Sequence, residues 1–409
     1  MNSWQLLILT LIFGLLFWQG FYLIARDAGR VMLWLAGLAS LALATAVALN
    51  MLNQYAFSIQ LALRLLRIEQ FLIVLTMLLG LAVVVTLAPG YDAWAHRFQN
   101  QKWPMGLAWL SLIGFSLVIG SVVISGMIVP GVEQMILLGA SLFLLGTAVS
   151  MIHASDQGEV WFPHFFRSFD YSFFTALLFG GQVALIMIFA TGVTFPMLLL
   201  LLGTIAAAIL VQVFSDSVQT AVDQIAFFNF PNIRRQRSDS RAESDATQRL
   251  DSSLNLMQMD EKTFTQHTRR ALSHMGNLPK LAANPLTNLP LVNVRLQMNG
   301  RHNSTLLRAT ELKIILSESI DRLKPPDEGD FGTTNAWRFY NALYFPYVKG
   351  LRPYSRRAYY AENGEEETAV KEALDWFRSQ VPERTLYNWQ NAAAQLIARD
   401  LRERSQHIT

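Results

Sequence analysis

Apolar positions dominate the first half of the chain, in stretches long enough to cross a lipid bilayer. A hydrocarbon core about 30 Å thick requires roughly 20 apolar residues in a helix. Seven stretches meet this requirement, at about residues 4–25, 31–52, 68–88, 105–128, 132–152, 172–191 and 195–214. The last two form one run without charged residues, in which residues 191–196 supply a turn. We therefore predict a polytopic α-helical membrane domain of about seven spans over residues 1–214.

The N-terminal stretch is predicted to be the first span and not a cleavable signal peptide. Residues 1–3 carry no basic side chain, and the apolar run that follows is longer than that of a signal peptide. Further along, the polar segment 153–170 interrupts the apolar pattern. We interpret it as a loop at the membrane surface, where four aromatic side chains would lie at headgroup level: Trp161, Phe162, Phe165 and Phe166.

The pattern changes after the last span and predicts a helix followed by a linker over residues 215–253. Apolar residues recur at helical spacing between Val218 and Ile225, which predicts a juxtamembrane helix that either extends the last span into the cytosol or lies at the membrane interface. Residues 234–253 are polar, rich in serine and nearly free of apolar side chains. Because such a stretch cannot bury a core, we predict that it is a flexible linker.

Residues 254–409 show the periodicity of several packed helices. The strongest amphipathic pattern covers residues 305–326, where apolar residues follow a three-to-four spacing until two prolines end the helix. An aromatic-rich helix is predicted over 335–351, and two more over 368–380 and 383–406. The expected fold class is therefore all-α, with a membrane domain of about seven spans followed by an all-α cytosolic module.

The final pair of helices, within residues 368–406, has the spacing of a helix-turn-helix. Only Val381 and Pro382 separate the two helices, and Val381, Leu386 and Trp389 fall at positions that this motif keeps in its core. The outward positions near the start of the second helix carry side chains that can read base edges or hold phosphates. These are the candidate DNA-binding residues: Arg384, Thr385, Tyr387, Asn388, Gln390 and Asn391.

The segment VPERTLYNWQNAAAQLIARDLRE, residues 381–403, resembles the recognition helix of bacterial helix-turn-helix regulators of the sigma-factor region 4 type. Three upstream stretches resemble a regulator-like module of little-characterised bacterial proteins: TRRALSHMGNLPKLAANPLTNLPLV, ELKIILSESIDRLKPP and WRFYNALYFPYVKGL. The resemblance covers about residues 264–403 and implies a DNA-binding module. The chain departs from the usual motif at Trp376 and Gln380, where a small residue and a glycine are common, and in an inserted stretch over 352–366.

Charge separates the two halves and predicts an orientation. Residues 1–214 carry seven basic and seven acidic side chains, and the rest of the chain carries 26 and 23. With the N-terminus outside, the inner loops hold five basic residues: Arg26, Arg30, Arg97, Lys102 and Arg167. The outer loops hold Arg64 and Arg67, with the alternative that the stretch ALRLLRIE, which contains both, is the start of the third helix. The positive-inside rule therefore predicts a multi-pass protein of the bacterial inner membrane, with a cytoplasmic C-terminus.

The part that is predicted to read DNA is itself close to neutral. Residues 366–409 hold six basic and seven acidic side chains, whereas DNA-binding surfaces are usually basic. The basic excess lies upstream, because residues 262–324 hold ten basic and three acidic side chains. This region would either supply attraction to phosphates or form a basic face in solvent.

The sequence excludes or disfavours several kinds of chemistry. The chain has no cysteine, which excludes disulfides, Cys-based metal sites and a cysteine nucleophile. We find no phosphate-binding glycine loop, no HExxH or GxSxG motif and no kinase signature, so we predict no enzymatic activity and no cofactor. The spacing of His153, Asp156, Glu159 and His164 matches no metal signature, so no metal site is predicted. Ionisable residues are scarce in the predicted spans, which argues against an ion-coupled transporter.

These patterns favour a membrane-tethered one-component transcriptional regulator, whose membrane domain senses a signal and whose cytosolic module binds DNA. The alternative is a membrane scaffold whose helical module binds a protein partner, which the near-neutral last helices and the aromatic helix 335–351 favour. A third hypothesis is a transporter or channel with a regulatory tail. The expected partners are membrane lipid and DNA, with a cytosolic protein or a second copy of the chain as alternatives.

Overall fold

The chain folds into helices that divide into two compact units. A computed structural model describes residues 2–27, 29–87, 102–125, 131–157, 159–250, 255–298, 304–326, 332–351, 353–354 and 365–408, and no β-strand occurs among them. The first unit comprises Met1–Asp156 and Trp161–Phe230. The second comprises Gln157–Val160 and Pro231–Thr409. The predicted inner-loop residue Arg97 and most of the predicted insertion 352–366 lie outside the described residues.

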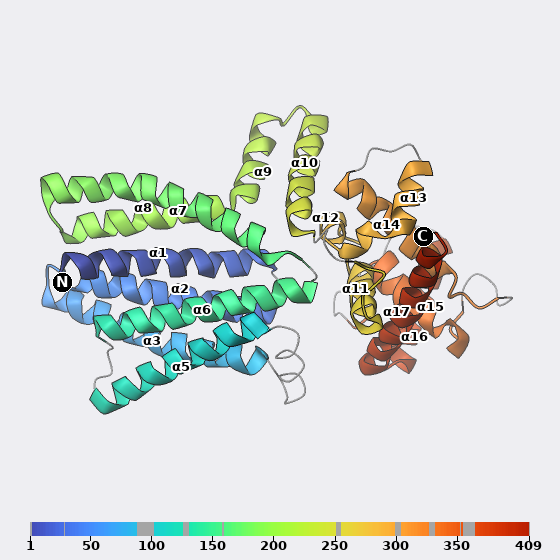
Figure 1. Ribbon diagram of the computed structural model, residues 1–409, viewed down its shortest axis with the longest axis horizontal. Coiled ribbons are helices and arrows are strands. Elements are labelled where there is room, and N and C mark those ends of the chain that lie inside the picture. Colours follow the sequence, from blue (N-terminus) through green and yellow to red (C-terminus); the bar gives the residue numbers. More distant parts are fainter. Residues whose placement is uncertain are drawn as a thin grey trace. The chain divides into compact units, whose positions relative to one another are not determined.

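The first unit is a bundle of long apolar helices (Figure 1). Its elements are α1 (Ser3–Arg26), α2 (Val31–Asn53), α3 (Ile59–Leu87), α5 (Lys102–Ser125), α6 (Val132–Gln157), α7 (Trp161–Ile186), the π-helical η1 (Met187–Thr191), α8 (Phe195–Val213) and α9 (Ser215–Ala226). In the described part of the chain, seven helices are long and apolar enough to span a membrane. They are α1, α2, α3, α5, α6, α8 and the continuous helix formed by α7 and η1. This indicates a multi-pass membrane protein.

Small residues allow the helices of the bundle to approach closely. A Cβ atom added to Gly20 on α1 would lie 2.9 Å from the carbonyl oxygen of Gly37 on α2, so any larger side chain would push the two helices apart. Gly146 on α6 leaves room in the same way for the side chain of Gln19. The predicted turn over 191–196 is present, and it uses Gly192 in the left-handed region (φ 69°), which glycine adopts without strain.

Helices extend into two polar segments of this half, which decides between the two alternatives for residues 53–69 and shows that the loop prediction for 153–170 is wrong. Helix α3 begins at Ile59, so Arg64 and Arg67 lie on a helix and not in a loop. The segment 153–170 is not a surface loop either, because α6 continues to Gln157 and α7 begins at Trp161. The physical reason is that a helix satisfies its own backbone hydrogen bonds, so it can continue past the hydrocarbon region with polar side chains.

The second unit is a compact helical module. Its elements after residues 157–160 are α10 (Pro231–Arg249), α11 (Glu261–Ser273), α12 (Leu278–Ala282), the 3₁₀ turn η2 (Pro285–Asn288), α13 (Pro290–Met298), α14 (Thr305–Asp321), η3 (Asn335–Trp337), α15 (Arg338–Leu343), the π-helical η4 (Tyr344–Val348), α16 (Glu365–Gln380) and α17 (Glu383–Gln406). The amphipathic helix predicted over 305–326 is α14, and its Leu312, Ile315, Leu316 and Ile320 are fully buried. They pack in one core with Ile397 and Leu401 of α17.

The linker predicted over residues 234–253 is mostly helical, which corrects that prediction. Helix α10 is long and polar, but its last turns are attached to the module. Ala246 is buried in the module's core, and the Glu243 carboxylate accepts a hydrogen bond of 3.2 Å from the backbone N–H of Thr305 at the start of α14. The carbonyl of Arg249 accepts a bond of 2.9 Å from the N–H of Val160. A segment poor in apolar residues is thus ordered by a few contacts at one end.

Candidate functional site

The candidate DNA-binding residues lie on the last two helices, which pack on each other through an aromatic core. Helix α16 ends at Gln380 and α17 begins at Glu383, so Val381 and Pro382 form the connection. The indole rings of Trp376 on α16 and Trp389 on α17 stack with their centroids 5.7 Å apart and their planes at 19°. The stack fixes one helix against the other close to the turn.

Three residues that the sequence predicts as core contacts of this pair do lie in its core. Val381 and Leu386 are buried, and Trp389 is half-buried against the same cluster. Phe345 of η4 lies in this cluster too, so the pair packs against the aromatic segment that precedes it. Trp376, where the usual motif has a small residue, is accommodated because Trp389 stacks on it.

The six candidate DNA-binding residues do not form one exposed surface. Thr385, Gln390 and Asn391 are half-buried. The exposed residues are Arg384, Tyr387 and Asn388, which lie within the first two turns of α17. The side-chain amide of Gln390 donates a 3.2 Å hydrogen bond to the carbonyl oxygen of Ala342. Gln390 therefore holds α17 against α15.

A basic side chain from the upstream region meets the exposed start of α17. The guanidinium of Arg269 on α11 lies 4.4 Å from the ring centroid of Tyr387, which is the distance of a cation–π contact. Burial raises the pKa of the neighbouring Tyr347 hydroxyl, and the charge of Arg269 partly offsets that rise. The upstream basic segment and the predicted reading helix are thus adjacent within the second unit.

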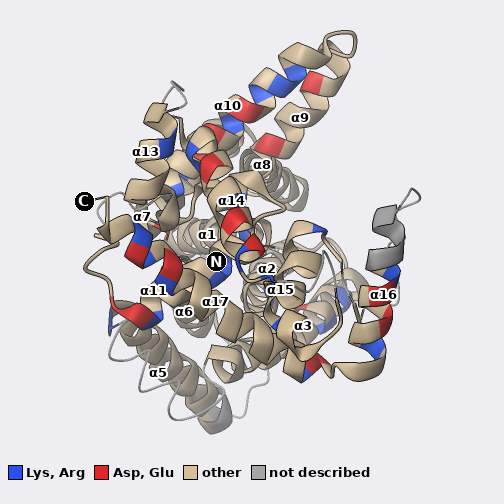
Figure 2. Ribbon diagram, turned by 90° about the vertical axis from the view of Figure 1, so that its right-hand side faces the viewer, with Lys and Arg blue, Asp and Glu red and all other residues tan. Residues whose placement is uncertain are grey.

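Elsewhere in the second unit, the basic side chains alternate with acidic ones. Figure 2 shows both signs of charge along α10, α11 and α16. Arg295 lies 2.7 Å from a carboxylate oxygen of Glu318, and Arg322 lies 3.1 Å from Asp400 on α17. Asp400 lies outside residues 262–324, so it adds a negative charge beside this region that the residue count of the region does not include.

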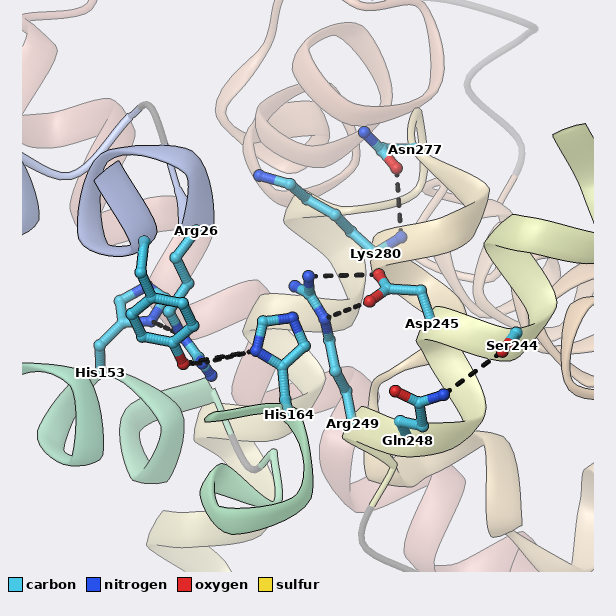
Figure 3. Close-up of polar contacts among 10 residues, drawn as sticks. Arg26, His153, His164, Ser244, Asp245, Gln248, Arg249, Asn277 and Lys280 are labelled. Carbon is cyan, nitrogen blue, oxygen red and sulfur yellow. Dashed lines mark hydrogen bonds and ion pairs between the residues drawn. The ribbon is translucent and has the colours of Figure 1, made fainter. Parts of the chain in front are cut away.

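In the first unit, a polar network joins α1, α6 and α7 near the end of the bundle that is opposite the N-terminus (Figures 1 and 3). Arg26 is 6% exposed, and its guanidinium donates to the Tyr22 hydroxyl at 2.7 Å and to Nδ1 of His153 at 3.3 Å. Nδ1 of His164 on α7 lies 3.4 Å from the same guanidinium. Nε2 of His153 lies 3.5 Å from Asp27. The two histidines therefore both face the guanidinium of Arg26.

Two further polar side chains, Gln19 and Glu69, are buried inside the bundle. Gln19 is 1% exposed, donates to the carbonyl oxygen of Phe143 at 2.8 Å and accepts from Ser40 at 3.2 Å, which links α1, α2 and α6. Glu69 on α3 is fully buried, and its Oε1 accepts a 2.9 Å bond from the amide of Asn50 on α2. Its Oε2 has no hydrogen-bond partner among the described residues.

Three ionisable residues, Arg26, Glu69 and His153, are buried on helices that are long and apolar enough to span a membrane. Glu69 stands between Ile68 and Gln70 at the start of the predicted third span, whereas α3 begins ten residues earlier, at Ile59. No three His, Asp or Glu side chains in the described part of the chain lie together as metal ligands would. Comparison with known proteins finds no match to this chain among protein-family models, curated proteins or solved structures.

Proposed function

We propose that this protein is a membrane-tethered one-component transcriptional regulator, in which α16 and α17 act as a helix-turn-helix-like pair that binds DNA. One observation carries the proposal: the start of α17 exposes Arg384, Tyr387 and Asn388, while Leu386 and Trp389 on its other side pack against α16. In a helix-turn-helix, the early residues of the second helix enter the major groove while its inner side rests on the first helix.

The contacts narrow the residues that would read DNA. Arg384 and Asn388 have the side chains that bond guanine and adenine edges, and both are exposed. Arg269 lies beside Tyr387 and would contact a phosphate, which adds a basic side chain from outside the near-neutral final segment. Gln390 would position α17 through its bond to Ala342 and would not contact DNA.

The first unit would sense the signal in this proposal, and the second would lie in the cytoplasm. The orientation rests on the distribution of basic residues in the loops. The buried network around Arg26 joins three helices, so a ligand or a change that displaces one of them would alter the other two. Regulation then requires that the signal favours one of two states of the protein.

The test is DNA binding by the full-length protein in lipid nanodiscs. Fluorescence anisotropy with genomic DNA fragments should show binding that weakens steeply with salt, as phosphate contacts require. The double variant Arg384→Ala, Asn388→Ala should lose sequence-specific binding. Arg399→Ala is the matched control, because Arg399 is an exposed arginine near the other end of α17 and should leave specific binding unchanged. Absence of salt-sensitive binding, or equal binding by all variants, refutes the proposal.

A scaffold that binds a protein partner is the second candidate. It is favoured by the near-neutral charge of residues 366–409 and by the exposed aromatic ring of Tyr387. Aromatic side chains are enriched at protein interfaces. Crosslinking of the full-length protein in its native membrane would then recover one defined protein, and Tyr387→Ala would abolish that crosslink without any DNA being involved.

A transporter is the third candidate, and the buried carboxyl of Glu69 favours it. Ionisable groups inside membrane bundles commonly mark ion or substrate paths. Proteoliposomes that contain the purified protein should in that case show a substrate-dependent flux that Glu69→Gln abolishes.

A further inference from the structure

Helix α9 begins at the point where the last apolar span ends. Only Phe214 separates Val213 of α8 from Ser215 of α9, and the backbone of Phe214 (φ −99°, ψ 24°) departs from helical geometry. Consequently, α9 does not continue along the axis of α8 but lies crosswise to it (Figure 1). If α8 crosses the bilayer, a helix in this direction runs along the membrane surface.

The side chains of α9 are divided between two faces. Val218, Ala221, Val222 and Ile225 follow the three-to-four spacing that places residues on one side of a helix, and they form what we call the apolar stripe of α9. The same spacing puts the polar residues on the other side: Asp216, Gln219, Thr220 and Asp223.

Within the first unit, the apolar stripe of α9 is exposed. The side chains of Val222 and Ile225 are 55% and 81% exposed, and Phe228 and Phe230, which follow α9, are 69% and 57% exposed. Exposed apolar area on this scale is unfavourable in water and marks a contact with something outside the chain.

We propose that the apolar stripe of α9, with Phe228 and Phe230, is inserted at the boundary between lipid headgroups and acyl chains of the bilayer that the spans cross. Three observations select lipid as the occupant: the stripe is continuous in sequence with the last span, α9 lies crosswise to that span, and its polar residues are on the opposite side. Interfacial helices have this combination of an apolar side, a polar side and low overall hydrophobicity.

The basic residues that follow in the sequence fit the same site. Arg234, Arg235 and Arg237 come within a few residues of Phe230, and basic side chains at that position attract anionic headgroups.

The absence of cysteine from the native chain allows a direct test with single spin labels. Full-length variants Val222→Cys, Ile225→Cys, Gln219→Cys and Thr220→Cys are labelled and placed in nanodiscs of phosphatidylcholine and phosphatidylglycerol. Collision of each label with oxygen, which concentrates in lipid, is compared with collision with a water-soluble nickel chelate. Leu178→Cys on the exposed side of α7 and Gln395→Cys on the exposed side of α17 serve as lipid and water references.

The labels at 222 and 225 should resemble the Leu178 reference, with a several-fold higher oxygen-to-nickel ratio than the labels at 219 and 220. Equal nickel accessibility at all four positions would place α9 in water and overturn the inference. Labels at 222 and 225 that are shielded from both reagents would mean that protein covers the stripe, which overturns it as well.

Discussion

The buried carboxyl of Glu69 depends on one hydrogen-bond partner, the half-buried Asn50. The Glu69 carboxyl has one bond of 2.9 Å to Asn50, and its second oxygen has none among the described residues. A buried polar atom without a partner costs free energy because its bonds to water are not replaced. The contact therefore couples α2 and α3 strongly, even though it is a single hydrogen bond.

Replacement of Asn50 by alanine should destabilise the first unit by about 1–3 kcal/mol, because it leaves both carboxyl oxygens of Glu69 without a partner. The measurement is thermal unfolding of the full-length protein in nanodiscs. Gln54→Ala is the control, because Gln54 is exposed and makes only a 3.5 Å contact with Asn50. In the double variant Asn50→Leu, Glu69→Leu, where neither polar group remains, most of the stability should return. A double variant that is no more stable than Asn50→Ala would contradict this reading.

His267 on α11 makes the stability of the second unit dependent on pH. Burial lowers the pKa of His267 from its ordinary value of 6.5 to about 4. Between these two values the unfolded chain binds a proton that the folded chain does not, so the free energy of unfolding falls as the pH drops from 6.5 towards 4. The slope is at most about 1.4 kcal/mol per pH unit for one group.

Hydrogen exchange of amide protons in α11 and α14 at pH 7 and pH 5, corrected for intrinsic rates, measures this dependence. His267→Gln should remove the slope whatever its effect on overall stability, and His407→Gln at the exposed C-terminal end should retain it. An unchanged slope in His267→Gln would assign the pH dependence to other groups.

At the residue scale, the sequence was informative where spacing alone decides the environment. Val381 and Leu386 could be predicted as core residues because both are apolar and stand at positions that a helix-turn-helix keeps in its core. Gln390 could not be separated from the other candidate DNA-binding residues, since its partner is the carbonyl of Ala342, 48 residues earlier in the chain. Glu69 was misjudged because the predicted helix began next to it, whereas α3 begins at Ile59.

Among the elements, the α16–α17 pair depends on the stacked indoles of Trp376 and Trp389. Trp389→Ala should destabilise the pair by about 3 kcal/mol, which is the lower end of the range for truncating a large aromatic residue in a core. Trp376→Ala should lower the stability of the pair less in the Trp389→Ala background than in the native chain, because the two substitutions remove the same contact.

A double-mutant cycle measured by hydrogen exchange of amides in α17 tests this coupling in the full-length protein. Tyr387→Ala is the control on the exposed side of α17 and should leave exchange in the rest of the helix nearly unchanged. Strictly additive effects of the two tryptophan substitutions would show that the stack does not join the helices.

The lengths of the elements were harder to predict than their existence. Apolar runs delimit the part of a helix inside the hydrocarbon, but α3 and α7 extend beyond it with polar side chains. Helix α10 was predicted as a linker because it has few apolar residues, yet Ala246 and Glu243 are enough to attach it to the module. Such contacts depend on residues far away in the sequence, here at the start of α14, and local composition does not reveal them.

For the whole molecule, the proposed orientation places the N-terminus outside and the second unit in the cytoplasm. Single cysteines introduced into the cysteine-free chain can report this in intact cells. Asn2→Cys should react with a membrane-impermeant maleimide before lysis, and Gln395→Cys should react only after it. The opposite pattern would reverse the topology and would remove the second unit from access to DNA.

The central claim is that the full-length protein contacts DNA from the membrane through the start of α17. Crosslinking of protein to DNA in living cells, followed by recovery of the protein and sequencing of the attached DNA, tests it most directly. We expect enrichment of a small set of DNA segments with the native chain and with Arg399→Ala, and loss of that enrichment with the double variant Arg384→Ala, Asn388→Ala at equal protein levels in the membrane. Recovery of no specific DNA, or of the same segments with the double variant, would contradict it.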